Sequence, residues 1–304
     1  MSSSAAAKRI VVFLSTGKQG TGVVKALSAL NSASTDPTFK VLAVTRSASS
    51  SKAKAFAKLP GVEILESEYD AAKVFEKALK GGPVYGVFSV QQSFDNPNGG
   101  VKGETEQGIQ VADEAAKAGV QHLIYSSVDF GGLAKTDIPH FESKRLVEQH
   151  IEELQKARPN LKTTILRPTF FMDNISQNGG FLGKAVLTAS INTVKKPLQM
   201  IACSDIGFFA ALAFQQPEKY AGKSLSLAGD ELDMTQLRKQ FAEVQEYQIP
   251  QTFSLIGWLL ANGLKELKTM FAFFNNTGYS VNIAELRALH PNLKTWREYV
   301  KTEY

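Results

Sequence analysis

A short polar stretch with two glycines lies between an apolar run and a helical pattern near the start of the chain. Its residues are Ser15, Thr16, Gly17, Lys18, Gln19 and Gly20. Apolar residues 10–14 predict a buried strand, and the spacing of residues 23–30 predicts a helix. A glycine-rich turn at that place lets backbone amides approach a pyrophosphate, which the helix N-terminus also favours. The stretch therefore predicts a dinucleotide site, although a tight strand-to-helix connection would also need these glycines.

The end of the second predicted strand, residues 41–44, indicates which dinucleotide the site prefers. The strand is followed by Thr45 and Arg46. An acidic residue here suits the free 2′-hydroxyl of NAD, whereas an arginine can bind the 2′-phosphate of NADP through two parallel hydrogen bonds. Arg46, with a second positive charge on Lys18, favours NADP(H) over NAD(H). A solvated loop position is the other interpretation of Arg46.

Further candidates follow the later predicted strands, at residues 84–88, 120–125 and 163–166. In doubly wound sheets, ligands bind beyond the carboxyl ends of the strands. The polar and aromatic residues at these ends are Gln91, Ser126, Ser127, Thr169, Phe170 and Phe171. This mixture suits a nicotinamide and an apolar substrate. Core packing is an equally good interpretation of Phe171.

His140 and Lys144 are spaced four residues apart, so a helix places them on one face. Lys144 could bind the ribose hydroxyls of a nicotinamide nucleotide, or act as a base if burial disfavours its charged form. His140 could supply a proton. The commoner role of such a lysine is to lie on the surface, and only its place after the fifth strand favours the functional interpretation.

Strands and helices alternate through the first half of the chain, which is typical of parallel βαβ winding. The other expected elements are a strand at 62–65 and helices at 71–79, 105–118 and 142–156. We expect an α/β protein with a Rossmann-type, doubly wound parallel sheet in a domain of residues 1–178. Residues 179–304 lose this period and are expected to form a smaller, partly interleaved α/β region for a substrate or partner.

Composition excludes several other classes of protein. The chain has 304 residues, of which 43% are hydrophobic and 21% charged, as in ordinary globular proteins. Its single cysteine, Cys203, excludes an internal disulfide and a cysteine-rich metal site, so we expect no metal and a reducing compartment. The net charge of +5 is spread along the chain, so direct nucleic-acid binding is not expected. Without an apolar run of signal or membrane-span length, we expect a cytoplasmic protein away from membranes, with a nuclear location and the oligomeric state left open.

Several ordered motifs together resemble the NmrA-like family, an atypical branch of the short-chain dehydrogenase/reductase superfamily. They are residues 16–20, 44–46, 119–127, 140–144, 166–174 and 278–282. The resemblance implies a Rossmann domain with a small C-terminal region that binds NADP(H) or NAD. Residues 17–20 would then meet the pyrophosphate, Arg46 the 2′-phosphate, Glu68 the adenine edge and Lys144 the nicotinamide ribose. Phe170, Phe171 and Asn174 would border a substrate pocket.

The sequence departs at two positions from the patterns that it resembles. Leu14 replaces the glycine that usually begins the family's loop, and its Cβ could crowd the turn. His140 occupies the position of the catalytic tyrosine of the wider superfamily, as is common among NmrA-like proteins.

Three functions remain open on this sequence. In the first, the protein is a redox-state sensor that binds NADP(H) and a protein partner. In the second, it is an NADPH-dependent reductase that acts on a small apolar or aromatic carbonyl or enone substrate and uses Lys144 with His140. In the third, Leu14 prevents cofactor binding and the fold is an interaction scaffold. Whether the protein is an enzyme stays open.

Overall fold

The computed structural model describes residues 6–32, 38–93, 99–175, 180–251 and 264–304. The chain divides into two compact units that interleave in sequence. The first unit comprises Met1–Ser127, Ser143–Leu166 and Ile206–Leu225, and the second comprises Val128–Glu142, Arg167–Asp205 and Ser226–Tyr304. The domain boundary expected after residue 178 stays a prediction, because each of these compact units is made of three separate segments of the chain.

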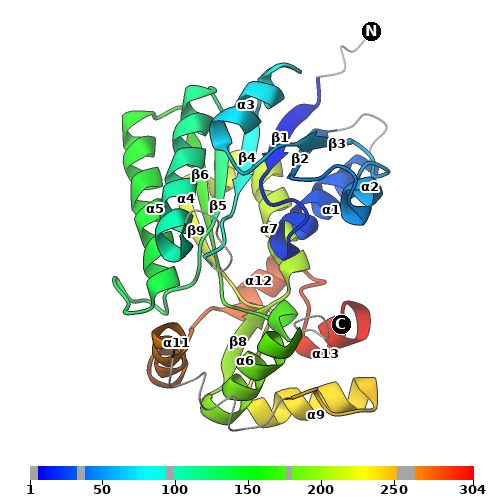
Figure 1. Ribbon diagram of the computed structural model, residues 1–304, viewed down its shortest axis with the longest axis vertical. Helices are drawn as coiled ribbons and strands as arrows, with labels where there is room; N and C mark the ends of the chain where they lie inside the picture. The colour runs from blue at the N-terminus through cyan, green and yellow to red at the C-terminus, as the bar shows by residue number, and fades with distance from the viewer. Residues whose placement is uncertain (1–5, 33–37, 94–98, 176–179, 252–263) are drawn as a thin grey trace. The chain divides into compact units, whose positions relative to one another are not determined.

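The first unit is built on a seven-stranded sheet (Figure 1). Its strands are β1 (Lys8–Val12), β2 (Phe39–Thr45), β3 (Val62–Glu66), β4 (Gly86–Ser89), β5 (His122–Ser126), β6 (Lys162–Pro168) and β9 (Lys223–Leu227). They are ordered β3-β2-β1-β4-β5-β6-β9, and the pairs from β3 to β6 are parallel. This order is that of a Rossmann fold, with the reversal between β1 and β4. The predicted fold class is confirmed.

Helices cover both faces of this sheet. They are α1 (Lys18–Ser32), α2 (Ser51–Phe56), α3 (Ala71–Leu79), α4 (Gly100–Lys117), α5 (Pro139–Ala157), α7 (Cys203–Gln215) and α8 (Pro217–Tyr220). Apolar residues of α3, α4 and α5 share a buried cluster with Val11 and Phe13. On the other face, Phe214 of α7 packs so closely on Gly86 that a Cβ there would lie 2.6 Å from its ring. The sheet is therefore packed against helices on both of its faces.

The second unit contains a three-stranded sheet ordered β10-β8-β7. Its elements are β7 (Phe170–Phe171), a 3₁₀ turn at Met172–Asn174, α6 (Gly180–Thr193), β8 (Leu198–Ile201), β10 (Asp230–Leu232), α9 (Met234–Gln245), α11 (Lys265–Asn276), α12 (Ile283–Leu289) and α13 (Trp296–Thr302). Trp296 and Phe241 anchor one of its apolar clusters, and Phe271 and Phe274 anchor another. The predicted second α/β region is present.

Two element boundaries near the glycine stretch differ from expectation. The first strand ends at Val12 and not at Leu14, and α1 begins at Lys18, five residues before the predicted helix. The reason is the backbone of Leu14, whose φ of 47° is left-handed and cannot continue a strand. The turn is thus tighter than the apolar run suggested, and Lys18, Gln19 and Gly20 belong to the first turn of the helix.

His122 of β5 is a buried imidazole in the core of the first unit. Its Nε2 atom lies 2.8 Å from Thr164 Oγ1, and its ring packs edge-on against Phe214. Burial, together with the charges of Lys162 and Lys8, lowers the pKa of His122 from 6.5 to about 4. The fold therefore keeps this imidazole neutral.

We expect the stability of the protein to fall in mild acid because of His122. Its pKa is lower in the folded than in the unfolded chain, so its contribution is complete above the unfolded value and is lost as the pH falls from about 6.5 towards 4. The lost contribution reaches about 3 kcal/mol. Urea unfolding midpoints across this range should fall less steeply in His122→Gln than in the wild type. His150→Gln is the matched histidine control, and equal slopes for wild type and His122→Gln would contradict the assignment.

Candidate functional site

The glycine stretch forms a hydrogen-bonded turn between β1 and α1. The amide of Gly17 donates to the carbonyl of Leu14 at 2.9 Å, and the amide of Thr21 donates to the carbonyl of Gly17 at 2.9 Å. The buried hydroxyl of Ser15 donates to the Val44 carbonyl at the end of β2, at 2.7 Å. Ser15 thus ties the turn to the neighbouring strand, while Gly17 and Lys18 are exposed at the helix N-terminus. An exposed helix N-terminus of this kind can receive a phosphate.

The conformation of Leu14 restricts which residue type can stand at position 20, in the first turn of α1. A Cβ at position 20 would lie 2.2 Å from the Leu14 carbonyl oxygen, so only glycine fits there. At position 17 the same oxygen would lie 3.1 Å from a Cβ. The left-handed backbone of Leu14 costs about 1–2 kcal/mol for a residue other than glycine. The turn expected to be crowded by Leu14 is formed, with Leu14 itself taking the strained conformation.

Positive charges gather where the turn meets the end of β2. Arg46 follows β2 directly, is exposed, and makes no hydrogen bond or ion pair with the described part of the chain. Lys52 of α2 donates from Nζ to the carbonyl of Thr16 in the turn, at 2.8 Å. With Lys18 in the first turn of α1, the first unit presents three cations around one strand end. Lys52 was not predicted, because nothing in its spacing shows that α2 folds back onto the turn.

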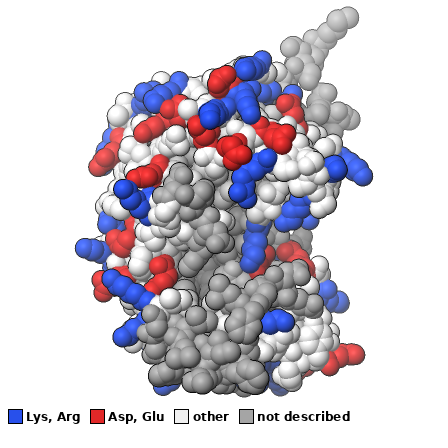
Figure 2. Space-filling model, in the orientation of Figure 1, with Lys and Arg blue, Asp and Glu red and all other residues white. Residues whose placement is uncertain are grey.

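On the face of the molecule shown in Figure 2, the described Lys and Arg side chains are interspersed with Asp and Glu side chains.

The turn is also tied to the end of β5. The hydroxyl of Ser126 donates to Oε1 of Gln19 at 2.5 Å. The predicted pyrophosphate residue Gln19 and the β5-end residue Ser126 are therefore in contact within the first unit. Glu68, which lies two residues after β3, is exposed.

Gln91, after β4, is buried within a polar network. Its amide nitrogen donates to Ser89 Oγ and to the hydroxyl of Tyr69, both at 2.8 Å, and Tyr69 donates to the Val90 carbonyl at 3.0 Å. Burial, with the charge of Glu104, raises the pKa of Tyr69, so its phenol stays neutral. The side chain of Gln91 thus organises the chain after β4, and its predicted role at the cofactor stays a prediction.

Lys144 of α5 lies against a buried carboxylate that the sequence did not reveal. Its Nζ is 3.0 Å from Oε1 of Glu104, on α4, and 5.9 Å from the centre of the Tyr125 ring. The other oxygen of Glu104 accepts a hydrogen bond from Ser143 at 2.5 Å. Glu104 is 1% exposed, so this is a buried ion pair and not a surface one. The surface interpretation of Lys144 is therefore wrong.

His140, at the start of α5, belongs to the second unit and pairs there with Glu266 of α11. The imidazole Nδ1 and the backbone amide of His140 both contact Oε1 of Glu266, the amide at 3.1 Å. Burial raises the pKa of Glu266, but the hydrogen bonds and charge of His140 outweigh it, so the pKa is lowered. The pair fixes the orientation of the ring, which also packs edge-on against Phe141 at 4.9 Å.

The predicted pocket residues of the second unit differ in exposure. Thr169 is buried, and both its amide and its hydroxyl donate to the Leu227 carbonyl at 3.0 Å. Phe170 and Phe171 form β7 and are partly exposed, and Phe170 packs edge-on against Phe274 at 6.0 Å. Asn174 is exposed at the end of the 3₁₀ turn. Phe170 also packs on both apolar clusters of the second unit, while the predicted role of Phe170 and Phe171 at a pocket stays a prediction.

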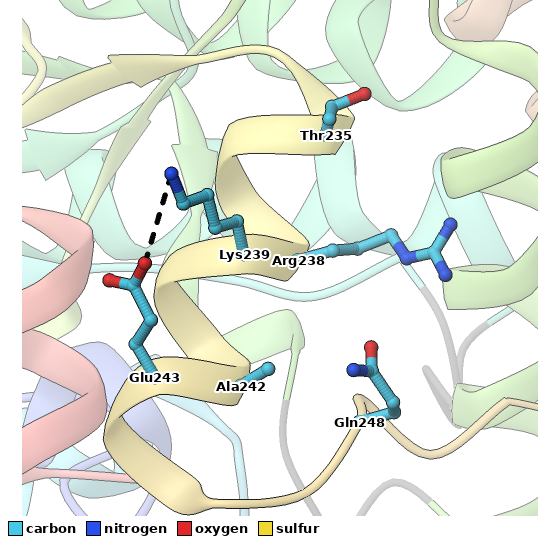
Figure 3. Close-up of a pocket in the computed structure, with 6 residues that line it drawn as sticks. All are labelled: Thr235, Arg238, Lys239, Ala242, Glu243 and Gln248. Carbon is cyan, nitrogen blue, oxygen red and sulfur yellow. Dashed lines mark ion pairs between the residues drawn. The ribbon is translucent and has the colours of Figure 1, made fainter.

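A separate open cavity of about 560 Å³ lies on α9 in the second unit (Figure 3). It is lined by Thr235, Arg238, Lys239, Ala242, Glu243 and Gln248. Lys239 turns toward Glu243 at 4.0 Å, while Arg238 extends away from that pair. Glu243 also pairs with Arg297 of α13. The cavity contains none of the predicted site residues.

The described residues also set limits on other chemistry. Within them, no three His, Cys, Asp or Glu side chains gather closely enough to hold a metal ion. None of the described helices is long and apolar enough to cross a membrane.

Known proteins resemble this chain over almost its full length. The sequence profile of the NmrA-like family matches residues 6–300. An NmrA-like family domain-containing protein of Dictyostelium discoideum is 28% identical over 307 residues, which covers 97% of each chain.

Two solved structures share the fold. NmrA, a negative transcriptional regulator in complex with NADP, superposes with a TM-score of 0.70 at 18% identity and covers 99% of this chain and 96% of its own. Triphenylmethane reductase of Citrobacter sp., complexed with NADP(H), has a TM-score of 0.70 at 20% identity and covers 98% of this chain and 100% of its own. NmrA has also been solved with NAD. With a sequence profile that matches from residue 6 to residue 300, this chain belongs to the NmrA-like family.

Proposed function

We propose that the protein binds NADP(H) on its first unit and acts as a sensor of the cellular NADP(H) redox state. The observation that carries the binding proposal is the set of three cations, Lys18, Arg46 and Lys52, around a helix N-terminus at the end of β2. Amides of residues 17–20 would hold the pyrophosphate, and the cations would bind the 2′-phosphate. NAD lacks that phosphate, so these charges favour NADP(H).

The absence of a phenolic acid supports a sensor over an enzyme. Position 140 carries a histidine whose Nδ1 is engaged by Glu266, and Lys144 is paired with Glu104. Binding requires only fixed amides and cations, whereas turnover requires a group that gives up or takes a proton at the substrate. A family member that reads the NADP+ to NADPH ratio and passes it to a protein partner needs no such group.

A reductase is the second candidate function, and the partly exposed rings of Phe170 and Phe171 favour it. An apolar surface of this kind suits a small aromatic or apolar carbonyl or enone compound. Lys144 would then bind the nicotinamide ribose and His140 would supply the proton. The likeness of the fold to a reductase adds nothing specific, because one fold serves many functions.

We expect NADPH to bind more tightly than NADH, and Arg46→Ala to remove the difference. The guanidinium supplies charge-assisted hydrogen bonds to the 2′-phosphate, so its loss should weaken NADPH roughly 10- to 100-fold and leave NADH nearly unchanged. Lys52→Ala should act in the same direction with a smaller effect. Isothermal titration of the purified protein measures both affinities.

Lys54→Ala, which removes an exposed lysine of the same short helix, is the matched control and should leave both affinities unchanged. Equal affinities of the wild type for NADPH and NADH would refute the NADP preference. Binding of neither dinucleotide would instead support the cofactor-free scaffold.

We expect no NADPH oxidation above the buffer rate with a panel of aromatic aldehydes and enones, followed by absorbance. The reason is that the chain lacks the phenolic proton donor of the wider superfamily at position 140. NADP+ and NADPH should instead bind with different affinities and give different protection from hydrogen exchange. The reason is that a sensor must bind the oxidised and the reduced cofactor unequally. Turnover that Lys144→Met abolishes would replace the sensor proposal by the reductase.

A further inference from the structure

We propose that Glu104 is a positioning residue that fixes Lys144 in place as a charged ammonium group, so that Lys144 serves as a cationic donor and not as a base. This inference deepens the proposed function and rests on it for the ligand that Lys144 would meet. It concerns a residue of α4 that lies 40 positions before Lys144 in sequence.

The geometry makes Glu104 a two-point support for the start of α5. Its Oε1 lies 3.0 Å from Lys144 Nζ, and its Oε2 accepts the hydroxyl of Ser143 at 2.5 Å. The two partners are consecutive residues, so one carboxylate determines the position of both side chains. Only 12% of the Lys144 side chain and 1% of the Glu104 side chain are exposed, which excludes the solvent screening that weakens surface pairs.

Among the described residues, Lys144 is the one cation paired with Glu104. Its aromatic neighbours Tyr69 and Tyr125 are phenols whose pKa is raised by burial and, in second or third place, by the negative charge of Glu104 itself. These phenols stay neutral and cannot balance a carboxylate. A buried carboxylate without a cation is strongly destabilising, so folding favours the charged amine.

The charge state decides what Lys144 can do. A neutral amine could take a proton from a substrate, but an ammonium has three donors and no acceptor. The carboxylate of Glu104 lies 3.0 Å from Nζ, where it attracts a positively charged group. Of the two roles open to Lys144, binding the nicotinamide ribose hydroxyls is the one compatible with this pair.

The first test needs no cofactor. Lys144→Met should lower the urea unfolding midpoint markedly, because Glu104 is left as a buried, uncompensated charge. Glu104→Gln added to Lys144→Met should restore part of the loss, since the double variant buries no charge. A double variant no more stable than Lys144→Met would overturn the pairing.

The second test reads the charge of Lys144 directly. Acetic anhydride at about pH 8 acetylates only neutral amines, and peptide mass spectrometry gives the labelling of Lys144 relative to the exposed Lys54. We expect the ratio to rise several-fold in Glu104→Gln. Asp205→Asn, which neutralises another buried carboxylate paired with His290 and Lys294, is the matched control for general destabilisation and should leave the ratio unchanged. An unchanged ratio in Glu104→Gln would overturn the proposal.

The third test links the pair to the ligand. Glu104→Gln should weaken NADPH binding roughly 5- to 10-fold in the wild-type background and not at all in the Lys144→Met background. Equal weakening in both backgrounds would show that Glu104 does not act through Lys144. If the wild type binds no NADPH, the proposed function fails, while the stability and labelling tests still decide the role of Glu104.

Discussion

The approach of the Leu14 carbonyl to the first turn of α1 is the constraint on which the candidate cofactor site depends. Because Leu14 is left-handed, its carbonyl turns toward the helix, accepts the Gly17 amide and occupies the space where residue 20 would carry a Cβ. The helix can begin at Lys18 only because Gly20 is there. The exposed amides, the cations and the bond from Ser126 to Gln19 are all arranged around this one contact.

The sequence predicted the fold well because alternating apolar runs and helical spacing are local signals. The six predicted strands and the helix at 71–79 appear, the latter with its predicted bounds. Arg46 was also found at a strand end, because a topological rule places it there. The strand predicted to end at Leu14 was too long, because an apolar residue gives no sign of a positive φ.

Three partners of the site were missed for a common physical reason. Lys52, Glu104 and Glu266 each contact the predicted residues through tertiary packing, from helices α2, α4 and α11. A single sequence contains no period or spacing that links Glu104 to Lys144 or Glu266 to His140. Glu104 also lies one residue before the helix predicted at 105–118, whereas α4 begins at Gly100 and buries it.

The cations at the two ends of the candidate dinucleotide site differ in their exposure and in their pairing. This difference helps to distinguish a sensor from an enzyme. At the proposed phosphate end, Arg46 is exposed, so a phosphate could replace the water around its guanidinium. At the Lys144 end, the cation is buried and already balanced by Glu104. Such a cation can orient a bound ligand, but together with its carboxylate it adds little net charge to the site.

Tyr69 and Tyr125 of the first unit are poor substitutes for the missing tyrosine at position 140. Burial raises the pKa of Tyr69 and Tyr125, and the charge of Glu104 raises both further, which makes each a weaker acid than an ordinary tyrosine. The carboxylate that fixes Lys144 therefore adds to the effect of burial in keeping these two phenols neutral. A site with a fixed cation and suppressed acids is better suited to holding a nicotinamide nucleotide than to protonating a product, which supports the sensor proposal.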